Sequence, residues 1–279
     1  MMRPRHAVAA AGVAAALIAG SGAVELAPAY LSQAAAAPVA AARTGLVDAP
    51  LATATAATVA APTSRPQLYR ETVRYGARDT SPYQISHVYE VQIRLARTGI
   101  YKGPVTGYFG TATLAAVKAF QRSQRLSQTG VVNQATWTRL ITVSRQRSPG
   151  WYQVPAACKA AGWHTCYSRS TYEVFTFYSG TLWNTWLVRG GAAGLQTVLG
   201  TYRVYWQDID HRSAMFDNAP MPYSQFFYGG EALHGSATMM DPRLGHSHGC
   251  VNMYIEDATE LWRLTGGRAH VVTVYGAWR

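Results

Sequence analysis

Two hydrophobic periods divide the chain. Between residues 85 and 142, apolar residues recur every three or four positions, as at Val88, Val91 and Leu95. This spacing predicts amphipathic helices. From residue 172 onward, apolar and polar residues mostly alternate, which predicts β-strands. Two further helices are predicted from the same helical period in Leu114, Val117 and Phe120, and in Trp137, Leu140 and Ile141.

The second half of the chain is predicted to be mainly β. Residues 172–178, 183–187, 201–206 and 269–275 are rich in aromatic and β-branched residues. One helix is predicted there, from Ile255 to Leu264, because its charged residues leave an apolar face free to pack. We therefore expect an α+β multidomain chain, with a small three-helix module followed by a mainly β, sandwich-like domain.

A short repeat lies inside the helical module. Residues 106–113 and 129–136 share the frame Thr-Gly-x4-Ala-Thr. Each copy offers a glycine for a turn and then polar residues suited to the start of a helix. The aromatic residues Tyr101, Tyr108 and Phe109 lie in predicted loops, where they either stack on sugar rings or fill the small core.

The N-terminal region differs in composition from the rest. Arg3 and Arg5 precede an uncharged apolar run, which predicts a secretory signal peptide over residues 1–37, with an uncleaved membrane anchor as the alternative. Residues 38–81, rich in Ala, Pro and Thr, are predicted to be a flexible linker. The helical module is expected at 82–143 and the β domain at 158–279.

The chain is basic, with a formal net charge of +11. An exported protein of this charge is attracted to anionic wall polymers or a membrane surface. Nucleic acid is not expected as a partner, because the chain has no Lys/Arg cluster and no nucleic-acid-binding motif. No cofactor motif is present, so no cofactor is expected, and the sequence does not fix an oligomeric state.

The chain has three cysteines. In an oxidising compartment Cys158 and Cys166 are predicted to close a short disulfide loop and to leave Cys250 free. The alternatives are a disulfide that includes Cys250, or no disulfide. A free cysteine outside the cytoplasm points to a chemical role for its thiol.

Cys250 stands in the segment Ser-His-Gly-Cys-Val-Asn, residues 247–252. A thiol nucleophile needs a nearby base, and His248 and His234 are both candidates. Glycines at 235 and 249 allow the backbone to approach a reacting carbonyl.

Two further interpretations of this segment stay open. If residues 246–250 are extended, His246, His248 and Cys250 share one face, and with His234 they would suit a tetrahedral zinc site. No Asp or Glu stands within the motif to serve such a site as a base. The second interpretation is a buried structural cysteine.

The two halves of the chain resemble two known families. The segments Val91-Gln92-x2-Leu95, Gly107-Tyr108-Phe109-Gly110 and Thr113-x2-Ala116-Val117-x2-Phe120-Gln121 are similar to the peptidoglycan-binding domain type 1. His234-Gly235 followed by Ser-His-Gly-Cys-Val-Asn resembles the YkuD-type L,D-transpeptidase catalytic domain of the actinobacterial type. Residues 219–230 and 200–206 support that resemblance. The chain departs from the family in lacking a proline before Gly200, in the extra His246, and in carrying Asn252 where many relatives have arginine.

The second resemblance implies roles for individual residues. Cys250 would be the acylated nucleophile and His234 the general base, held by the carbonyl of Gly235. The amides of Gly249 and Cys250 would form the oxyanion hole, and no metal is implied. His248 would shape the motif, and contacts to the substrate would come from Tyr223, Ser247 and Asn252.

The implied reaction is a two-step acyl transfer in the bacterial cell wall. Cys250 would attack the diaminopimelate carbonyl of a stem tetrapeptide and release D-alanine. A diaminopimelate amine of a neighbouring stem would then accept the acyl group. Water in its place would make the protein an L,D-carboxypeptidase. A zinc-dependent wall peptidase and a non-catalytic wall-binding protein are the two functions that compete with acyl transfer.

Overall fold

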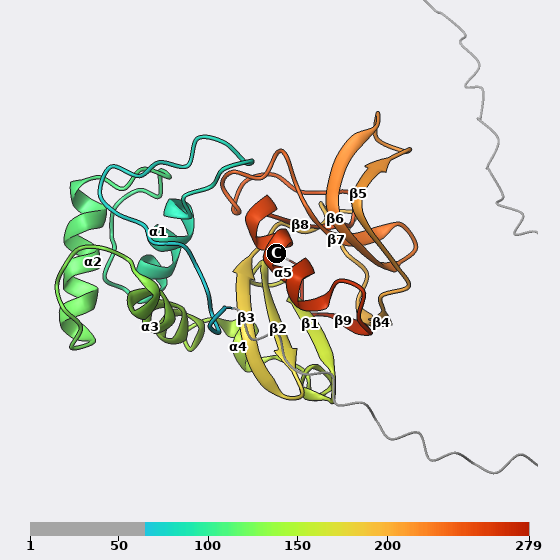
Figure 1. The fold of residues 1–279 in the computed structure, drawn as a ribbon, viewed down its shortest axis with the longest axis horizontal. Coiled ribbons are helices and arrows are strands. Elements are labelled where there is room, and N and C mark those ends of the chain that lie inside the picture. The colour runs from blue at the N-terminus through green and yellow to red at the C-terminus, as the bar shows by residue number, and fades with distance from the viewer. Residues whose placement is uncertain (1–64, 279) are drawn as a thin grey trace, which may run out of the picture. The chain divides into compact units, whose positions relative to one another are not determined.

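The computed structural model describes residues 65–278, all of which fall within one unit of the chain (Figure 1). The predicted signal peptide and residues 38–64 of the predicted linker lie outside the described residues. No helix within 65–278 has both the length and the apolar character needed to cross a bilayer.

Three helices form the first part, as predicted: α1 (Val88–Arg97), α2 (Thr111–Ser123) and α3 (Gln134–Arg145). The residues that set the helical period are mostly buried in a common core. Asn133 caps α3 by accepting a hydrogen bond from the amide of Thr136, whereas Gly110 precedes α2 without a side-chain cap. Phe109 is fully buried and Tyr101 nearly so, which settles for these two residues that they fill the core.

The internal repeat fastens loops to helices through buried glutamines. Gln92 of α1 accepts hydrogen bonds from the amides of Thr106 and Gly107, and its own amide donates to the carbonyl of Tyr108 and the hydroxyl of Thr113. In the second copy Gln121 of α2 makes the corresponding bonds to Gly130, Val131 and Thr136. The repeated Thr-Gly and Thr positions are therefore structural.

The linker prediction is wrong at its C-terminal end. Leu68 and Val73 are buried in the helical core, and Val73 pairs with Val132 by two backbone hydrogen bonds. Asp79 accepts hydrogen bonds from the amides of Ser86 and Tyr89 at the start of α1. Folded chain thus begins before Pro82. The segment shows no periodicity because it is irregular and contributes isolated core residues.

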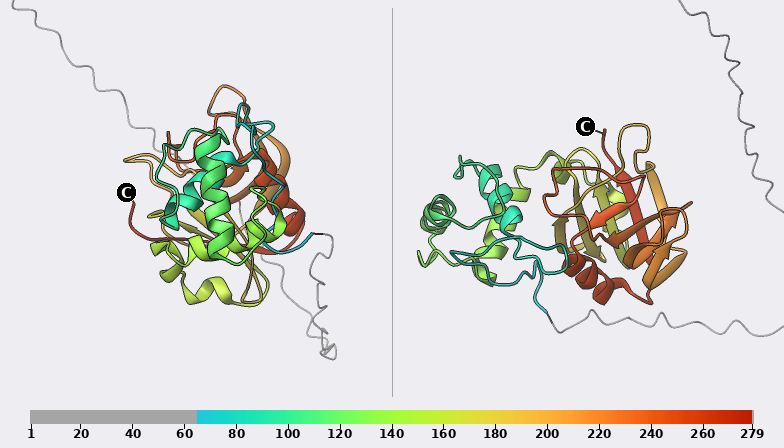
Figure 2. Two further views of the ribbon diagram at one scale, coloured as in Figure 1. Left: turned by 90° about the vertical axis from the view of Figure 1, so that its left-hand side faces the viewer. Right: turned by 90° about the horizontal axis from the view of Figure 1, so that it is seen from above.

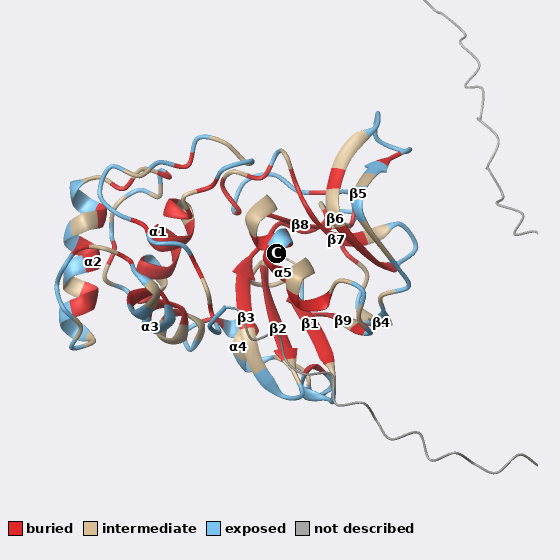
Figure 3. Cartoon of the chain, viewed as in Figure 1, coloured by how far each residue is buried: buried red, intermediate tan, exposed pale blue. Residues whose placement is uncertain are grey.

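The second part contains two sheets, and the predicted sandwich-like fold is confirmed. The order of the first is β3-β2-β1-β9-β4 and that of the second is β5-β6-β7-β8. The core between them takes apolar residues from both sheets, and Figure 3 shows β1 and β2 largely buried. The strands are β1 (Trp163–Ser168), β2 (Glu173–Tyr178), β3 (Thr181–Leu187), β4 (Gly200–Arg203), β5 (Trp206–Ser213), β6 (Ala219–Tyr228), β7 (Glu231–Gly235), β8 (Val251–Met253) and β9 (His270–Tyr275).

One helix completes this domain, α5 (Ile255–Thr265), which packs against β6 and β7 (Figure 2). It begins directly after β8 and buries the apolar face that includes Ala258, Leu261 and Leu264. The prediction of a helix at 255–264 is confirmed. Because β8 leads straight into α5, the segment before β8 is anchored on one side by the core.

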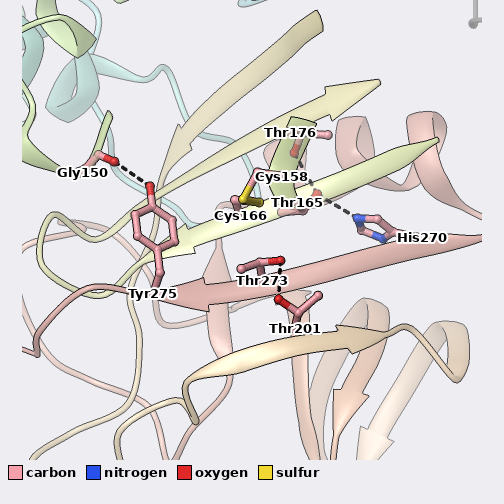
Figure 4. Close-up of a disulfide and its surroundings, with 9 residues drawn as sticks. All are labelled: Gly150, Cys158, Thr165, Cys166, Thr176, Thr201, His270, Thr273 and Tyr275. Carbon is pink, nitrogen blue, oxygen red and sulfur yellow. Dashed lines mark hydrogen bonds between the residues drawn. A yellow bond between two sulfur atoms is a disulfide. The ribbon is translucent and has the colours of Figure 1, made fainter. Parts of the chain in front are cut away.

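Short elements link the two parts of the chain. Helix α4 (Pro149–Tyr152) and the 3₁₀ turn η1 (Ala156–Lys159) follow α3, and Cys158 of η1 forms a disulfide with Cys166 of β1 (Figure 4). Beside this bond, the hydroxyl of Tyr275 donates to the carbonyl of Gly150. The disulfide leaves Cys250 as the free thiol.

A buried ionic network connects the helical module to the β domain. Glu173 of β2 accepts hydrogen bonds from Arg94 at 3.1 Å and Arg97 at 2.8 Å, both on α1. Glu90 of α1 pairs with Arg94 at 2.6 Å and with Arg70 at 2.9 Å. The side chains of both glutamates are fully buried, so these charges depend on one another.

Candidate active site

The parallel pairing of β7 and β8 sets the faces on which His234 and Cys250 lie. His234 lies opposite Asn252, and Leu233 lies opposite Val251. Strand side chains alternate, so Cys250, two residues before Asn252, belongs to the same face as His234. The cysteine packs against Met221, Phe226 and Ala232. The strand register thus brings the thiol and the imidazole to one side of this sheet.

The Cys250 thiol is half-buried and is not part of a disulfide. Its Sγ–H donates a long hydrogen bond of 3.7 Å to the carbonyl of Gly230. Burial raises the pKa of the thiol to about 11; the backbone amide of Ala232 lowers that pKa and the carboxylate of Glu231 raises it further. The thiol is therefore protonated at neutral pH.

The His234 side chain is buried. Its Nδ1 donates a hydrogen bond of 2.8 Å to the carbonyl of Gly235, and its ring also bonds the side chain of Asn252. Burial lowers the pKa of His234 to about 4, although the Gly235 carbonyl works in the opposite direction. The ring is thus neutral with its proton on Nδ1, which leaves Nε2 as the basic nitrogen. The hydrogen bond to Gly235 is the contact that the resemblance implies, and the catalytic roles of both residues stay predictions.

These two pKa values predict how the resting thiol reacts. Between about pH 4 and pH 11 the pair holds a neutral imidazole and a neutral thiol. We expect alkylation of Cys250 by iodoacetamide to rise about tenfold per pH unit from pH 7 to pH 10, because the thiolate fraction does so below the pKa. At pH 8 the rate should lie about two orders of magnitude below that of glutathione. Intact-mass measurement gives the rate; an alkylation rate that is flat from pH 6 to pH 9 would instead reveal a thiolate–imidazolium pair.

The Cys250 motif is held by its own serine. Ser247 is buried, and its hydroxyl donates to the carbonyl of Cys250 at 2.5 Å and accepts the amide of Gly249 at 3.1 Å. The amide expected to serve the oxyanion hole at Gly249 is therefore engaged in this turn. Gly249 has a φ of +126° and lies so close to Glu231 that a Cβ would come within 2.9 Å of the carboxylate, so the position needs glycine.

The remaining histidines of the motif are exposed and face different ways. His248 stacks on Phe216 at 4.6 Å, and His246 lies near Tyr172 and Trp278. Residues 246–250 are irregular and do not form a strand. The premise of the zinc interpretation is thus wrong, since the three histidines at 234, 246 and 248 are not brought together as ligands.

A different group has the spacing of metal ligands. In the part of the chain that the structure describes, ligand atoms of His87, Glu90 and Asp257 come within 4.8 Å of one another. Both oxygens of Glu90, however, are taken by the guanidinium groups of Arg70 and Arg94. This group is better described as part of the buried ionic network.

Two of the expected substrate contacts have their own partners in the structure. The Tyr223 ring packs on the core between the sheets, 6.2 Å from Trp262 of α5. Asn252 exchanges two backbone hydrogen bonds with Arg189 and is buried. These contacts position β8 and the His234 ring.

Sequence reasoning missed two residues of the site. Arg189 donates to the carbonyls of Thr238 and Leu244, and so holds the loop that leads to the Cys250 motif. Glu231 places a carboxylate beside Gly249 and Cys250, although the motif itself contains no acidic residue. Its position three residues before His234 is a signal only once the pairing of β7 with β8 is known.

Comparisons with known proteins agree in both parts of the chain. Residues 165–273 match a family described as the L,D-transpeptidase catalytic domain, and residues 85–140 match a putative peptidoglycan binding domain. Among solved structures, the chain is similar to an L,D-transpeptidase from Stackebrandtia nassauensis (23% identity, TM-score 0.46, covering 77% of this chain and 98% of that one). A second, from Xylanimonas cellulosilytica, has 22% identity and a TM-score of 0.42, covering 77% and 100%. An uncharacterized protein of Kitasatospora aureofaciens is 43% identical over 63 residues, which is 22% of this chain and about half (53%) of that protein's length.

Proposed function

We propose, from the premise that residues 165–273 belong to the L,D-transpeptidase catalytic domain family and residues 85–140 to a family of putative peptidoglycan binding domains, that this protein cross-links peptidoglycan. The observation that carries the proposal is that the register of β7 and β8 puts the free Cys250 thiol on the same face as His234. The bond from His234 to its neighbouring carbonyl supports the role of general base, because it leaves the second ring nitrogen basic.

In the first half-reaction, the Nε2 atom of His234 takes the proton of the Cys250 thiol as sulfur attacks. The attacked carbonyl is that of diaminopimelate in a stem tetrapeptide. The bond to the terminal D-alanine breaks, and D-alanine leaves with the proton from His234. The carbonyl of Gly235 fixes the ring in the tautomer that this step needs, as a carboxylate does in a Ser-His-Asp triad.

In the second half-reaction, an amine attacks the thioester at Cys250. The proposed acceptor is a diaminopimelate side chain of a neighbouring stem, which gives a direct cross-link. Water at the same carbonyl would give L,D-carboxypeptidase activity instead. The two outcomes share the acyl-enzyme, so the nucleophile that reaches it decides between them.

The helical module is proposed to hold the glycan while the β domain reacts. Tyr101 and Phe109 are buried and cannot stack on sugars, whereas Tyr108 is half-buried and carries the guanidinium of Arg78 over its ring at 4.2 Å. Glycan contact therefore falls to surface residues of the module. The proposed location is the bacterial cell wall outside the cytoplasm, where a net charge of +11 favours anionic polymers.

Intact-mass analysis tests the proposed function. We expect incubation with a stem tetrapeptide, or with a carbapenem, to add one acyl group to Cys250, and fragmentation to locate it there. A chelator should leave the adduct unchanged, while prior alkylation of the thiol should prevent it. If neither ligand acylates Cys250, the proposal fails. Loss of peptide cleavage with a chelator, but not with alkylation, would indicate a metallopeptidase.

A further inference from the structure

A carboxylate lies beside the nucleophile without a part in the mechanism above. Glu231 opens β7, three residues before His234, and is half-buried. Its carboxylate lies against Gly249, and it raises the pKa of the Cys250 thiol by its charge. Strand alternation puts Glu231 on the face of β7 opposite that of His234, and its carboxylate reaches the Cys250 motif at Gly249.

The Glu231 carboxylate is held in place by a backbone amide. Both its oxygens lie within hydrogen-bond distance of the Val198 amide, at 3.3 and 3.1 Å. The cation that acts on it is Arg169, whose guanidinium donates to the carbonyls of Gly276 and Thr197. Within residues 65–278 no ion pair joins Glu231 to a basic side chain. A carboxylate has about four acceptor sites, so this one retains capacity for another donor.

The second half-reaction needs such a group. An alkyl amine is an ammonium ion at neutral pH, and it must lose a proton before its lone pair can attack a thioester. His234 is poorly suited to bind or deprotonate the ammonium group, because burial lowers the pKa of its ring to about 4. Burial raises the pKa of Glu231 to about 7, while the Val198 amide and Arg169 lower it, which makes this carboxylate a stronger base than an exposed one.

We infer that Glu231 binds the ammonium group of the acceptor stem beside the Cys250 thioester and removes its proton, so that an amine is preferred to water as the nucleophile. This inference rests on the proposed function. It gives the site a residue for each half-reaction: His234 serves the donor, and Glu231 selects the acceptor.

The step balances without any further reactant. The ammonium gives one proton to the Glu231 carboxylate, and the resulting amine attacks the thioester carbonyl. The C–N bond forms, the nitrogen gives its extra proton to His234, and the C–S bond breaks. The departing sulfur takes that proton from His234, and the Glu231 carboxyl releases its own to solvent.

The variant Glu231→Gln tests this inference, because it should move the two half-reactions in opposite directions. Removing the charge lowers the pKa of the thiol, so acylation by a stem tetrapeptide at pH 8 should become faster by about two- to fivefold. Aminolysis of the acyl-enzyme should fall at least about tenfold, so that hydrolysed product replaces cross-linked product. The measurement is the ratio of dimer to hydrolysed tripeptide, together with the rate of acyl-enzyme formation.

Two controls separate this role from a structural one. Hydroxylamine is uncharged at pH 8, so the variant should still react with it at about the wild-type rate. Glu71→Gln removes an exposed carboxylate elsewhere and should behave as wild type. Equal slowing of acylation and aminolysis, or an unchanged product ratio, would overturn the inference alone. Wild-type protein that forms no acyl-enzyme would overturn the proposed function and the inference with it.

Discussion

Replacing Cys250 by alanine is expected to abolish acyl transfer, with release of D-alanine from a stem tetrapeptide falling at least about a thousandfold. The reason is that the site's remaining side chains supply no nucleophile: His234 is buried with its Nδ1 bonded to a carbonyl, and Ser247 is engaged in the turn. Product analysis by liquid chromatography and mass spectrometry gives the rate. No adduct should form on the variant at any concentration of donor.

The alanine variant should remain folded, which makes the result interpretable. The Cys250 thiol is half-buried and makes one long hydrogen bond, so its loss should shift the melting temperature by only a few degrees, about 1 kcal/mol or less. A matched control is His246→Gln, which changes an exposed residue of the same segment and should keep the rate within about threefold. Continued D-alanine release by the alanine variant would exclude a cysteine mechanism.

The second large effect is expected from Glu173→Gln, which should lower the free energy of unfolding by about 3–5 kcal/mol. Burial alone raises the pKa of Glu173, but Arg97 and Arg94 outweigh it and hold the pKa below its usual value. The amide keeps the shape of the side chain but removes the counter-charge that Glu173 gives to Arg97 and shares with Glu90 around the buried Arg94. Urea denaturation followed by circular dichroism measures the loss.

The pH dependence of stability checks the same network. Because Glu173 and Glu90 have lowered pKa values in the folded state, their contribution is complete above about pH 4.5 and is lost as the pH falls, for Glu90 towards pH 2. The wild-type curve should therefore fall more steeply than that of the Glu173→Gln variant over this range. A surface control, Asp208→Asn, breaks a partly exposed pair with His211 and should cost no more than about 1 kcal/mol. Similar losses for both variants would mean that burial of the network contributes nothing.

Hydrophobic periodicity predicted the helices and strands whose apolar residues lie in a regular pattern. The three helices and α5 each have one apolar face, and β2, β3 and β9 carry obvious β-branched or aromatic runs. β1 was not predicted, because it is buried throughout yet contains His164, Thr165 and Ser168. Its central polar residue, Thr165, finds its partners far along the chain, in Thr176 and His270. β6 was missed because Pro220 and Pro222 argue against a strand.

The candidate site was predicted as a motif but not as a geometry. The spacing of His234 and Cys250 pointed to the chemistry, and the strand register puts the two residues on one face of the sheet. The contacts of Glu231 and Tyr223 depend on which strands are neighbours, and such long-range pairing leaves no mark in local sequence. The zinc interpretation failed for the same reason, since it assumed an extended backbone where Ser247 makes a turn.

The paired glutamines of the helical module have a consequence for how it tolerates mutation. Gln92 and Gln121 each secure one loop by bonds that the other does not share. The losses in the free energy of unfolding caused by substitutions at Gln92 and at Gln121 should therefore add. Each copy of the repeat can therefore accumulate substitutions independently of the other copy.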